Sequence, residues 1–346
     1  MDKKKVAWSF VAVLLAVFSI WAVLSQSGSL SIQDLGETIR TANPLWIILA
    51  VLSSLGFIVF EGQAILVILR NVGYKHKHRQ GFLYAAGDVY FSAITPSASG
   101  GQPASAFFMK KNGIPMSVIT AVLVLNLVMY TLGILTVGLV CLIAAPQVFL
   151  SFSFLSRFLI LLGTAVLIFM AVIFTMMLLH QKMLEKLSIG MVQLFHRLHL
   201  IKKPEKWIGK IERKMVEYQE CVTQMSGHKR TLVGAYFWNL AQRVSQISVT
   251  AFVFLATGGS AKEAWNVWIT QGFVAIGSNT VPIPGGMGVT DYLMLDGFRG
   301  MMANADAVRL ELLSRGLAFY VCVLISGITV GVGYIVYHLR NRRKRK

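Results

Sequence analysis

The sequence has few charged residues and few cysteines, and each shortage excludes a class of protein. Only 14% of its 346 residues are charged, whereas 55% are hydrophobic. This composition is too apolar for a soluble globular chain. The three cysteines, Cys141, Cys221 and Cys322, fall in two apolar runs and a basic segment. They predict neither a disulfide framework nor a metal cluster.

Acidic residues are also scarce, with 15 Asp and Glu against 33 Lys and Arg, which gives a net charge of +18. Such a charge is typical of nucleic-acid binding, but its placement favours a membrane protein. Most basic residues gather in five clusters, at 3–5, 70–79, 110–111, 182–230 and 340–346. If the apolar runs cross a membrane alternately, all five clusters lie on the cytoplasmic side. We therefore expect both termini in the cytoplasm, a bacterial cytoplasmic membrane location and no nucleic-acid partner.

The apolar runs are long enough for membrane-spanning helices, which need about 20 residues. The first follows a basic start but lacks a convincing cleavage site, so we interpret it as a retained span rather than a signal peptide. The sequence predicts an all-α polytopic membrane protein, with residues 1–346 forming one membrane domain. The six predicted spans are 6–24, 45–69, 114–144, 158–179, 232–256 and 307–337.

One stretch, ITPSASGGQPASAFF at 94–108, interrupts this apolar sequence with two prolines, three serines and a Gly-Gly pair. By the alternating topology it begins and ends on the cytoplasmic side. We predict a re-entrant hairpin, with one short helix at 81–95 and a second at 103–109. Irregular backbone at membrane depth is tolerated only where it is buried in protein or lines a wet cavity. The alternative is a cytoplasmic loop between ordinary helices.

A second stretch, NTVPIPGGMGVTD at 279–291, has prolines before a Gly-Gly pair in the same way but lies on the outer side. Each stretch is preceded by one span and followed by a long one. The sequence therefore predicts an inverted repeat, with units at about 45–144 and 232–337. Interrupted helices at corresponding positions of two halves indicate a transporter's binding site. Between the units, residues 182–230 predict a cytoplasmic amphipathic helical hairpin.

Polar residues within the spans are costly in lipid, and they predict where a substrate binds. Arg243 shares one helical face with Asn239 and Gln246. A structural alternative is an arginine paired to a carboxylate of another span. Groups of both signs favour the headgroup of a zwitterionic or amino-acylated phospholipid. The predicted substrate-binding residues are Arg243, Asn239, Gln246, Glu61, Asp88, Asn126, Ser97, Ser99, Gly100, Gly101, Gln102, Asn279, Gly285, Gly286, Asp291, Glu311 and Arg315.

The segments TPSASGGQPASAFFMKKNGIP at 95–115 and PIPGGMGVTD at 282–291 resemble the lysylphosphatidylglycerol synthase/flippase membrane-region family. The resemblance covers nearly the whole chain. It implies movement of aminoacylated phosphatidylglycerol from the inner to the outer leaflet, which contributes to resistance against cationic antimicrobial peptides. The residues that match the family's motifs are Pro96, Ser97, Ser99, Gly100, Gly101, Gln102 and Pro103, with Pro282, Pro284, Gly285, Gly286 and Asp291.

Larger relatives add a soluble domain that transfers lysine from lysyl-tRNA to phosphatidylglycerol. This chain ends at Lys346, directly after the last predicted span, so we expect that it does not catalyse that transfer alone and has no catalytic residues. The sequence has no GxxxxGK[ST] motif, and we predict no ATP site, cofactor or metal. Two alternatives are a lipid-modifying transferase within the membrane and a subunit that recruits a separate synthase through residues 183–222. We also consider a homo-oligomer.

Overall fold

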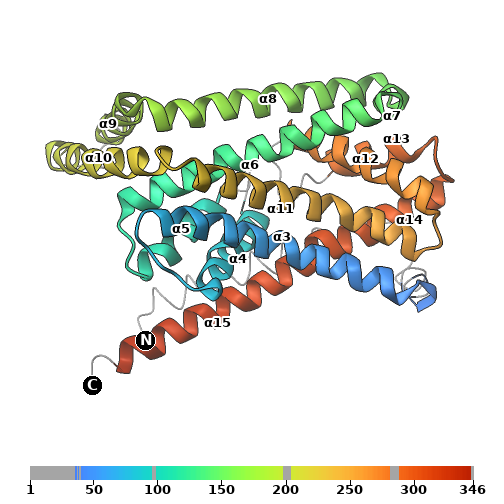
Figure 1. Cartoon of the computed structure of the whole chain (residues 1–346), viewed down its shortest axis with the longest axis horizontal. Helices are drawn as coiled ribbons and strands as arrows, with labels where there is room; N and C mark the ends of the chain where they lie inside the picture. The colour runs from blue at the N-terminus through green and yellow to red at the C-terminus, as the bar shows by residue number, and fades with distance from the viewer. Residues whose placement is uncertain are drawn as a thin grey trace.

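The computed structural model describes residues 40–95, 99–197, 204–280 and 288–343, together with Gly36 and Thr38. Every regular element in these residues is a helix. The predicted span at 6–24 lies outside them. Long helices run along the longest axis of the bundle (Figure 1). They are α3 (Pro44–Asn71), α6 (Met116–Ala144), α8 (Phe154–Leu179), α11 (Lys229–Ala256) and α15 (Cys322–Arg343).

Four helical stretches of the described residues are long and apolar enough to cross a membrane, by length and composition. They are Pro44–Asn71, Met116–Ala144, Phe154–Leu179 and Asn304–Tyr337, and they match four of the six predicted spans. Helix α11 occupies the position of the fifth and packs closely on α3, but is not among the four. It is less apolar because buried polar side chains such as Asn239 and Arg243 interrupt it. The prediction of an all-helical membrane protein is confirmed.

The first interrupted segment forms two helices, α4 (His78–Ile94) and α5 (Gly101–Lys111), which pack on each other. They have 17 and 11 residues, and at about 1.5 Å per residue neither spans a hydrocarbon core of about 30 Å. Thr95 closes the break between them. Its hydroxyl donates to the Phe91 carbonyl at 2.5 Å and accepts the Gly100 N–H at 2.8 Å. The remaining residues of the break, 96–98, lie outside the described part.

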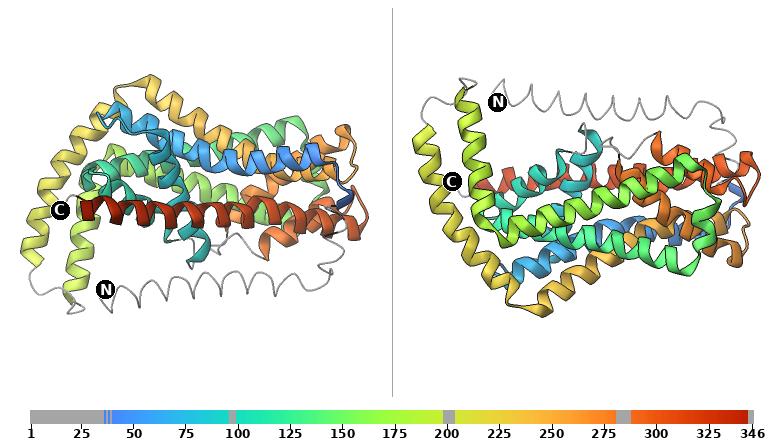
Figure 2. Two further views of the ribbon diagram at one scale, coloured as in Figure 1. Left: turned by 90° about the horizontal axis from the view of Figure 1, so that it is seen from below. Right: turned by 90° about the horizontal axis from the view of Figure 1, so that it is seen from above.

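The second interrupted segment has the same order, with α12 (Ala261–Gly277), a 3-10 turn η2 (Ser278–Thr280) and α13 (Val289–Phe298). Residues 281–287 lie outside the described part of the chain. Helix α13 is capped by Gly288, whose φ of 82° suits glycine. The Gly288 N–H donates to the Asp291 carboxylate at 3.0 Å. Helices α4 and α5 lie toward one end of the bundle, and α12 and α13 toward the other (Figures 1 and 2).

The two halves of the chain have helices of matching length in the same order. Helices α3 and α11 each have 28 residues, and they pack extensively against one another. Helices α4 and α12 each have 17 residues, followed by α5 with 11 and α13 with 10. This correspondence is what an inverted repeat requires, and the repeat stays a prediction.

The last long helix contains a π-helical turn. It runs from α14 (Asn304–Arg315) through the π segment Gly316–Val321 into α15. Each turn of π-helix takes up more residues than an α-helical turn, and such turns are frequent at functional sites. The turn follows Arg315 directly, so the change of helix geometry occurs beside a charged side chain of the bundle interior.

Two amphipathic helices, α9 (Gln181–Arg197) and α10 (Pro204–Ser226), pack on each other at the end of the bundle where α15 also ends (Figures 1 and 2). Hydrogen bonds to α3, α6 and α8 anchor helix α10 to the bundle, and Gln224 Nε2 donates to the Asn71 carbonyl of α3 at 3.0 Å. Ser117 of α6 donates to the Glu217 carboxylate at 2.6 Å, and the Tyr218 hydroxyl donates to the Met177 carbonyl of α8 at 3.1 Å. A short helix, α7 (Pro146–Ser151), connects α6 to α8.

Helices α3 and α4 cross where Gly62 meets Gly81, and we expect Gly62→Ala to destabilise the bundle. A Cβ at position 62 would lie 2.7 Å from the Gly81 carbonyl carbon and oxygen. Because backbone cannot move aside as a side-chain tip does, we expect a loss of about 1–3 kcal/mol. Thermal unfolding in detergent measures it, with Gly331→Ala as the control. A Cβ at 331 meets no atom within 4 Å, and equal melting temperatures for both variants would contradict the prediction.

Candidate functional site

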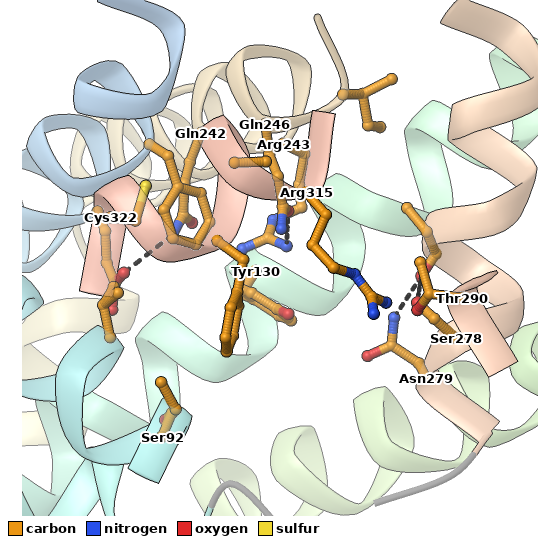
Figure 3. A pocket seen from close by; sticks show the side chains of 18 of the residues that line it. Ser92, Tyr130, Gln242, Arg243, Gln246, Ser278, Asn279, Thr290, Arg315 and Cys322 are labelled. Atoms are coloured by element: carbon orange, nitrogen blue, oxygen red, sulfur yellow. Dashed lines mark hydrogen bonds between the residues drawn. The ribbon is translucent and has the colours of Figure 1, made fainter. Parts of the chain in front are cut away.

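A cavity of about 560 Å³ lies between the helices of the two halves. Both members of each interrupted pair contribute side chains to it, as do α3, α6, α11 and the helix from α14 to α15. Figure 3 shows these side chains converging on one space. The predicted site residues that line it are Glu61, Asp88, Gln102, Asn126, Arg243, Gln246, Asn279 and Arg315.

Arg243 of α11 is 4% exposed and holds its guanidinium group at the cavity wall. The guanidinium carbon lies 4.1 Å from the ring centroid of Tyr130 and 5.2 Å from that of Phe57. Its Nη1 donates to the Gln246 Oε1 at 2.6 Å. Among the described residues no carboxylate lies within 4.0 Å of Arg243, so the structural alternative of a direct ion pair is not seen there. Aromatic faces stabilise the cation instead.

Two acidic side chains, Glu61 of α3 and Asp88 of α4, line the cavity and lie close enough to interact with each other. Gln242 Nε2 donates to Glu61 Oε2 at 3.0 Å. Asp88 accepts from Gln102 Nε2 at 2.6 Å and from the Ser92 hydroxyl at 3.1 Å. Gln102 belongs to the first turn of α5. Because α5 packs on α4 after the break in the chain, Gln102 reaches Asp88 and joins this group of side chains.

A second group of charges lies around Arg315, which also lines the cavity. Arg315 forms an ion pair with Asp291, and its Nε lies 3.5 Å from Glu311 Oε1. Glu311 and Arg315 are four residues apart on α14, which is the spacing of an ion pair on one helix face. Asn279 points toward the same region, and its Nδ2 donates to the Ala275 carbonyl at 2.6 Å. Figure 3 shows the Arg315 side chain extending away from Arg243 and toward Asn279.

Asn239 and Asn126 connect α11 to α6 below the cavity wall. Asn239 Nδ2 donates to Asn126 Oδ1 at 3.0 Å and to the Ala235 carbonyl at 2.9 Å. Asn239 is fully buried and does not line the cavity, whereas Asn126 does. We interpret Asn239 as a residue that positions Asn126.

The glycines of the first break pack against α4 rather than lining the cavity. A Cβ on Gly101 would overlap the Asp88 carboxylate, and one on Gly100 would lie 2.6 Å from the Thr95 methyl group. Ser99 also lies at the break, outside the cavity wall. The other predicted motif residues lie outside the described part of the chain: Pro96, Ser97, Pro282, Pro284, Gly285 and Gly286.

Several lining residues were absent from the sequence prediction. Gln242 lies on the same face of α11 as Asn239 and Gln246, three residues after one and four before the other, so helical spacing could have identified it. Gln271 is the eleventh residue of α12, as Asp88 is of α4, and alignment of the two repeats could have identified it. The other polar lining residues that were missed include Ser92, Ser278, Thr290 and Ser314.

The chain was compared with known proteins. A family model described as "Lysylphosphatidylglycerol synthase TM region" matches residues 7–326. No curated protein matches the chain. The matched region contains α3 to α13, α14 and the first residues of α15, and with them every lining residue of the cavity. The chain therefore belongs to the lysylphosphatidylglycerol synthase transmembrane-region family.

Proposed function

We propose that this protein moves an amino-acylated phospholipid, such as lysylphosphatidylglycerol, across the bacterial cytoplasmic membrane. The observation that carries the proposal is one cavity that holds both a buried arginine and the carboxyl groups of Glu61 and Asp88, with no carboxylate of the described residues paired directly to that arginine. The headgroup of such a lipid has both complements, a phosphate and a primary ammonium. Its phosphate would contact Arg243, and its ammonium would contact Glu61 and Asp88.

The two interrupted helix pairs would form the path. In this proposal α4 and α5 enter the membrane from the cytoplasmic side and α12 and α13 from the outer side. The matching helix lengths support this inverted repeat, and the cavity lies where such repeats place a substrate. Both termini and the α9–α10 pair would lie in the cytoplasm. The acyl chains would stay in lipid while the headgroup crosses the polar cavity.

Family membership supports a role in membrane lipid chemistry. Delivery of a cationic lipid to the outer leaflet lowers the negative surface charge, and this would weaken the attraction of cationic antimicrobial peptides. The cavity volume of about 560 Å³ lies within the range of small-molecule sites, which suits a headgroup.

Leaflet-resolved transfer in liposomes tests this function. The purified chain is reconstituted with fluorescent lysylphosphatidylglycerol in both leaflets, and dithionite then bleaches the outer one. We expect the inner-leaflet fluorescence to become accessible only in liposomes that contain the protein. The same measurement with fluorescent phosphatidylglycerol shows whether the lysyl group is required. The proposal would be refuted if the fraction of fluorescence protected from dithionite were the same as in protein-free liposomes, with folded protein confirmed by circular dichroism.

A further inference from the structure

Glu61 and Asp88 line the same part of the cavity, and the interaction between them depends on a proton. An ionised carboxylate only accepts hydrogen bonds, and two negative charges at close range repel each other, so the two groups interact favourably only when one of them is protonated. Glu61 is buried and Asp88 is partly buried, and each already accepts a hydrogen bond from a glutamine amide, Gln242 for Glu61 and Gln102 for Asp88. The pair with its one proton therefore carries a single negative charge.

Each of the two glutamine amides has an oxygen that receives no hydrogen bond from the described residues. Gln242 is 1% exposed and lines the cavity, yet its Oε1 has no hydrogen-bond partner among the described residues. The Oε1 of Gln102 is likewise without a partner there. A buried acceptor without a donor destabilises the site until a ligand supplies one. Two amide oxygens and two carboxyl groups thus offer acceptors to a ligand that brings several N–H donors.

We propose that Glu61 and Asp88 form an exchange site at which a primary ammonium group replaces the shared proton. The ammonium would be that of the lipid headgroup, so this inference rests on the proposed function for the identity of its ligand. On binding, the carboxyl O–H bond breaks and its proton passes to water. The three N–H groups of the ammonium then donate to the two carboxylates and to Gln242 Oε1. One positive charge leaves and one enters, so the net charge of the cavity is unchanged.

The other charged and titratable groups near the pair belong to several helices. Arg243 of α11, Tyr130 of α6 and Cys322 of α15 line the same cavity, and farther along it Arg315 is paired with Asp291 and Glu311. Proton release on binding therefore reports on carboxyl groups of the cavity, and substitutions of Glu61 and Asp88 are needed to distinguish this pair from Asp291 and Glu311. The exchange also gives lipid movement a means of coupling to a proton gradient.

Isothermal titration calorimetry with the full chain in detergent measures the exchange directly. The probe is short-chain lysylphosphatidylglycerol, titrated in buffers of differing ionisation enthalpy. We expect release of about one proton per lipid bound, and affinity that rises up to about tenfold per pH unit. The sign follows because a higher pH removes the proton that competes with the ammonium. Phosphatidylglycerol, which has no ammonium, should release none.

Two substitutions assign the proton to this pair. In Glu61→Gln the amide donates to Asp88 in place of the shared proton, so we expect binding without proton release and without pH dependence. Asp88→Asn should behave alike if Glu61→Gln fails to fold. The matched control is Glu217→Gln, which changes a carboxylate bonded to Ser117 outside the cavity and should release protons as the wild type does.

The inference is overturned if wild type binds the lysyl lipid without releasing protons, does not bind it, or if both pair variants still release them. Leaflet transfer measured on the same preparation separates this failure from failure of the proposed function. If lipid is transferred but no proton is released, the proposed function stands and the exchange site is contradicted. If a proton is released but no lipid is transferred, the exchange site stands and the proposed function is contradicted.

Discussion

Arg243→Ala is expected to slow leaflet transfer of lysylphosphatidylglycerol at least about thirtyfold. Truncating one partner of a buried charged hydrogen bond costs about 2–5 kcal/mol, and the lower figure corresponds to this factor. Among the described residues Arg243 has no direct carboxylate partner, whereas Arg315 is held by Asp291 and Glu311. Without its guanidinium group the cavity keeps its carboxyl groups and repels the lipid phosphate.

The dithionite assay measures this rate, with Arg309→Ala as the matched control. Arg309 lies on α14 in an exposed pair with Asp306, outside the cavity, and its loss should leave the rate unchanged. Arg243→Lys should restore only part of the rate, because a planar guanidinium stacks on the Phe57 and Tyr130 rings better than an ammonium does. A wild-type rate for folded Arg243→Ala would exclude this residue from the lipid path.

Gly101→Ala is expected to reduce both stability and transfer. The added Cβ would overlap the Asp88 carboxylate and the Ser92 hydroxyl, and would lie 2.7 Å from the Asp88 backbone oxygen. Overpacking of this kind costs about 1–3 kcal/mol. Relief requires α5 to move away from α4, which separates Asp88 from Gln102 and from Glu61. We therefore expect transfer to fall about tenfold or more, the factor that corresponds to about 1.4 kcal/mol.

Thermal unfolding in detergent and the dithionite assay report the two effects separately. The control is Gly190→Ala on α9, where an added Cβ meets no atom within 4 Å. It also changes glycine to alanine within a helix, so the intrinsic propensity gain is matched. If Gly101→Ala melts and transfers lipid as Gly190→Ala does, the close approach of α5 to α4 is not needed for the path.

Much of the fold follows from local properties of the sequence. Long apolar runs give α3, α6, α8 and the helix from α14 to α15, because backbone groups in lipid must be paired within the helix. The proline and glycine positions give the break between α4 and α5, since neither residue suits a helix interior. The fifth predicted span, 232–256, is less apolar than these helices, because the polar residues that form the site reduce the hydropathy of α11.

The pairing of site residues depends on tertiary packing, which no local pattern shows. Glu61 and Asp88 meet because Gly62 and Gly81 let α3 and α4 cross with their backbones in contact. The sequence identified each acid from its cost in lipid, but it did not give their partnership. For Arg243 it suggested a carboxylate as the structural alternative, whereas the structure supplies the rings of Phe57 and Tyr130. With 21 Phe and 10 Tyr in the chain, spacing alone could not select these two.

The π-helical turn at Gly316–Val321 has a consequence for the evolution of the last helix. Such a turn is what remains when one residue is inserted into an α-helix whose two ends are already fixed by packing. Deleting one residue there would restore an uninterrupted α-helix, but it would rotate α14 by about 100° relative to α15. Arg315 would then leave Asp291, while Cys322 kept its place against α3. The additional residue of the π-helical turn thus lets α14 and α15 each keep the helix face that its own contacts require.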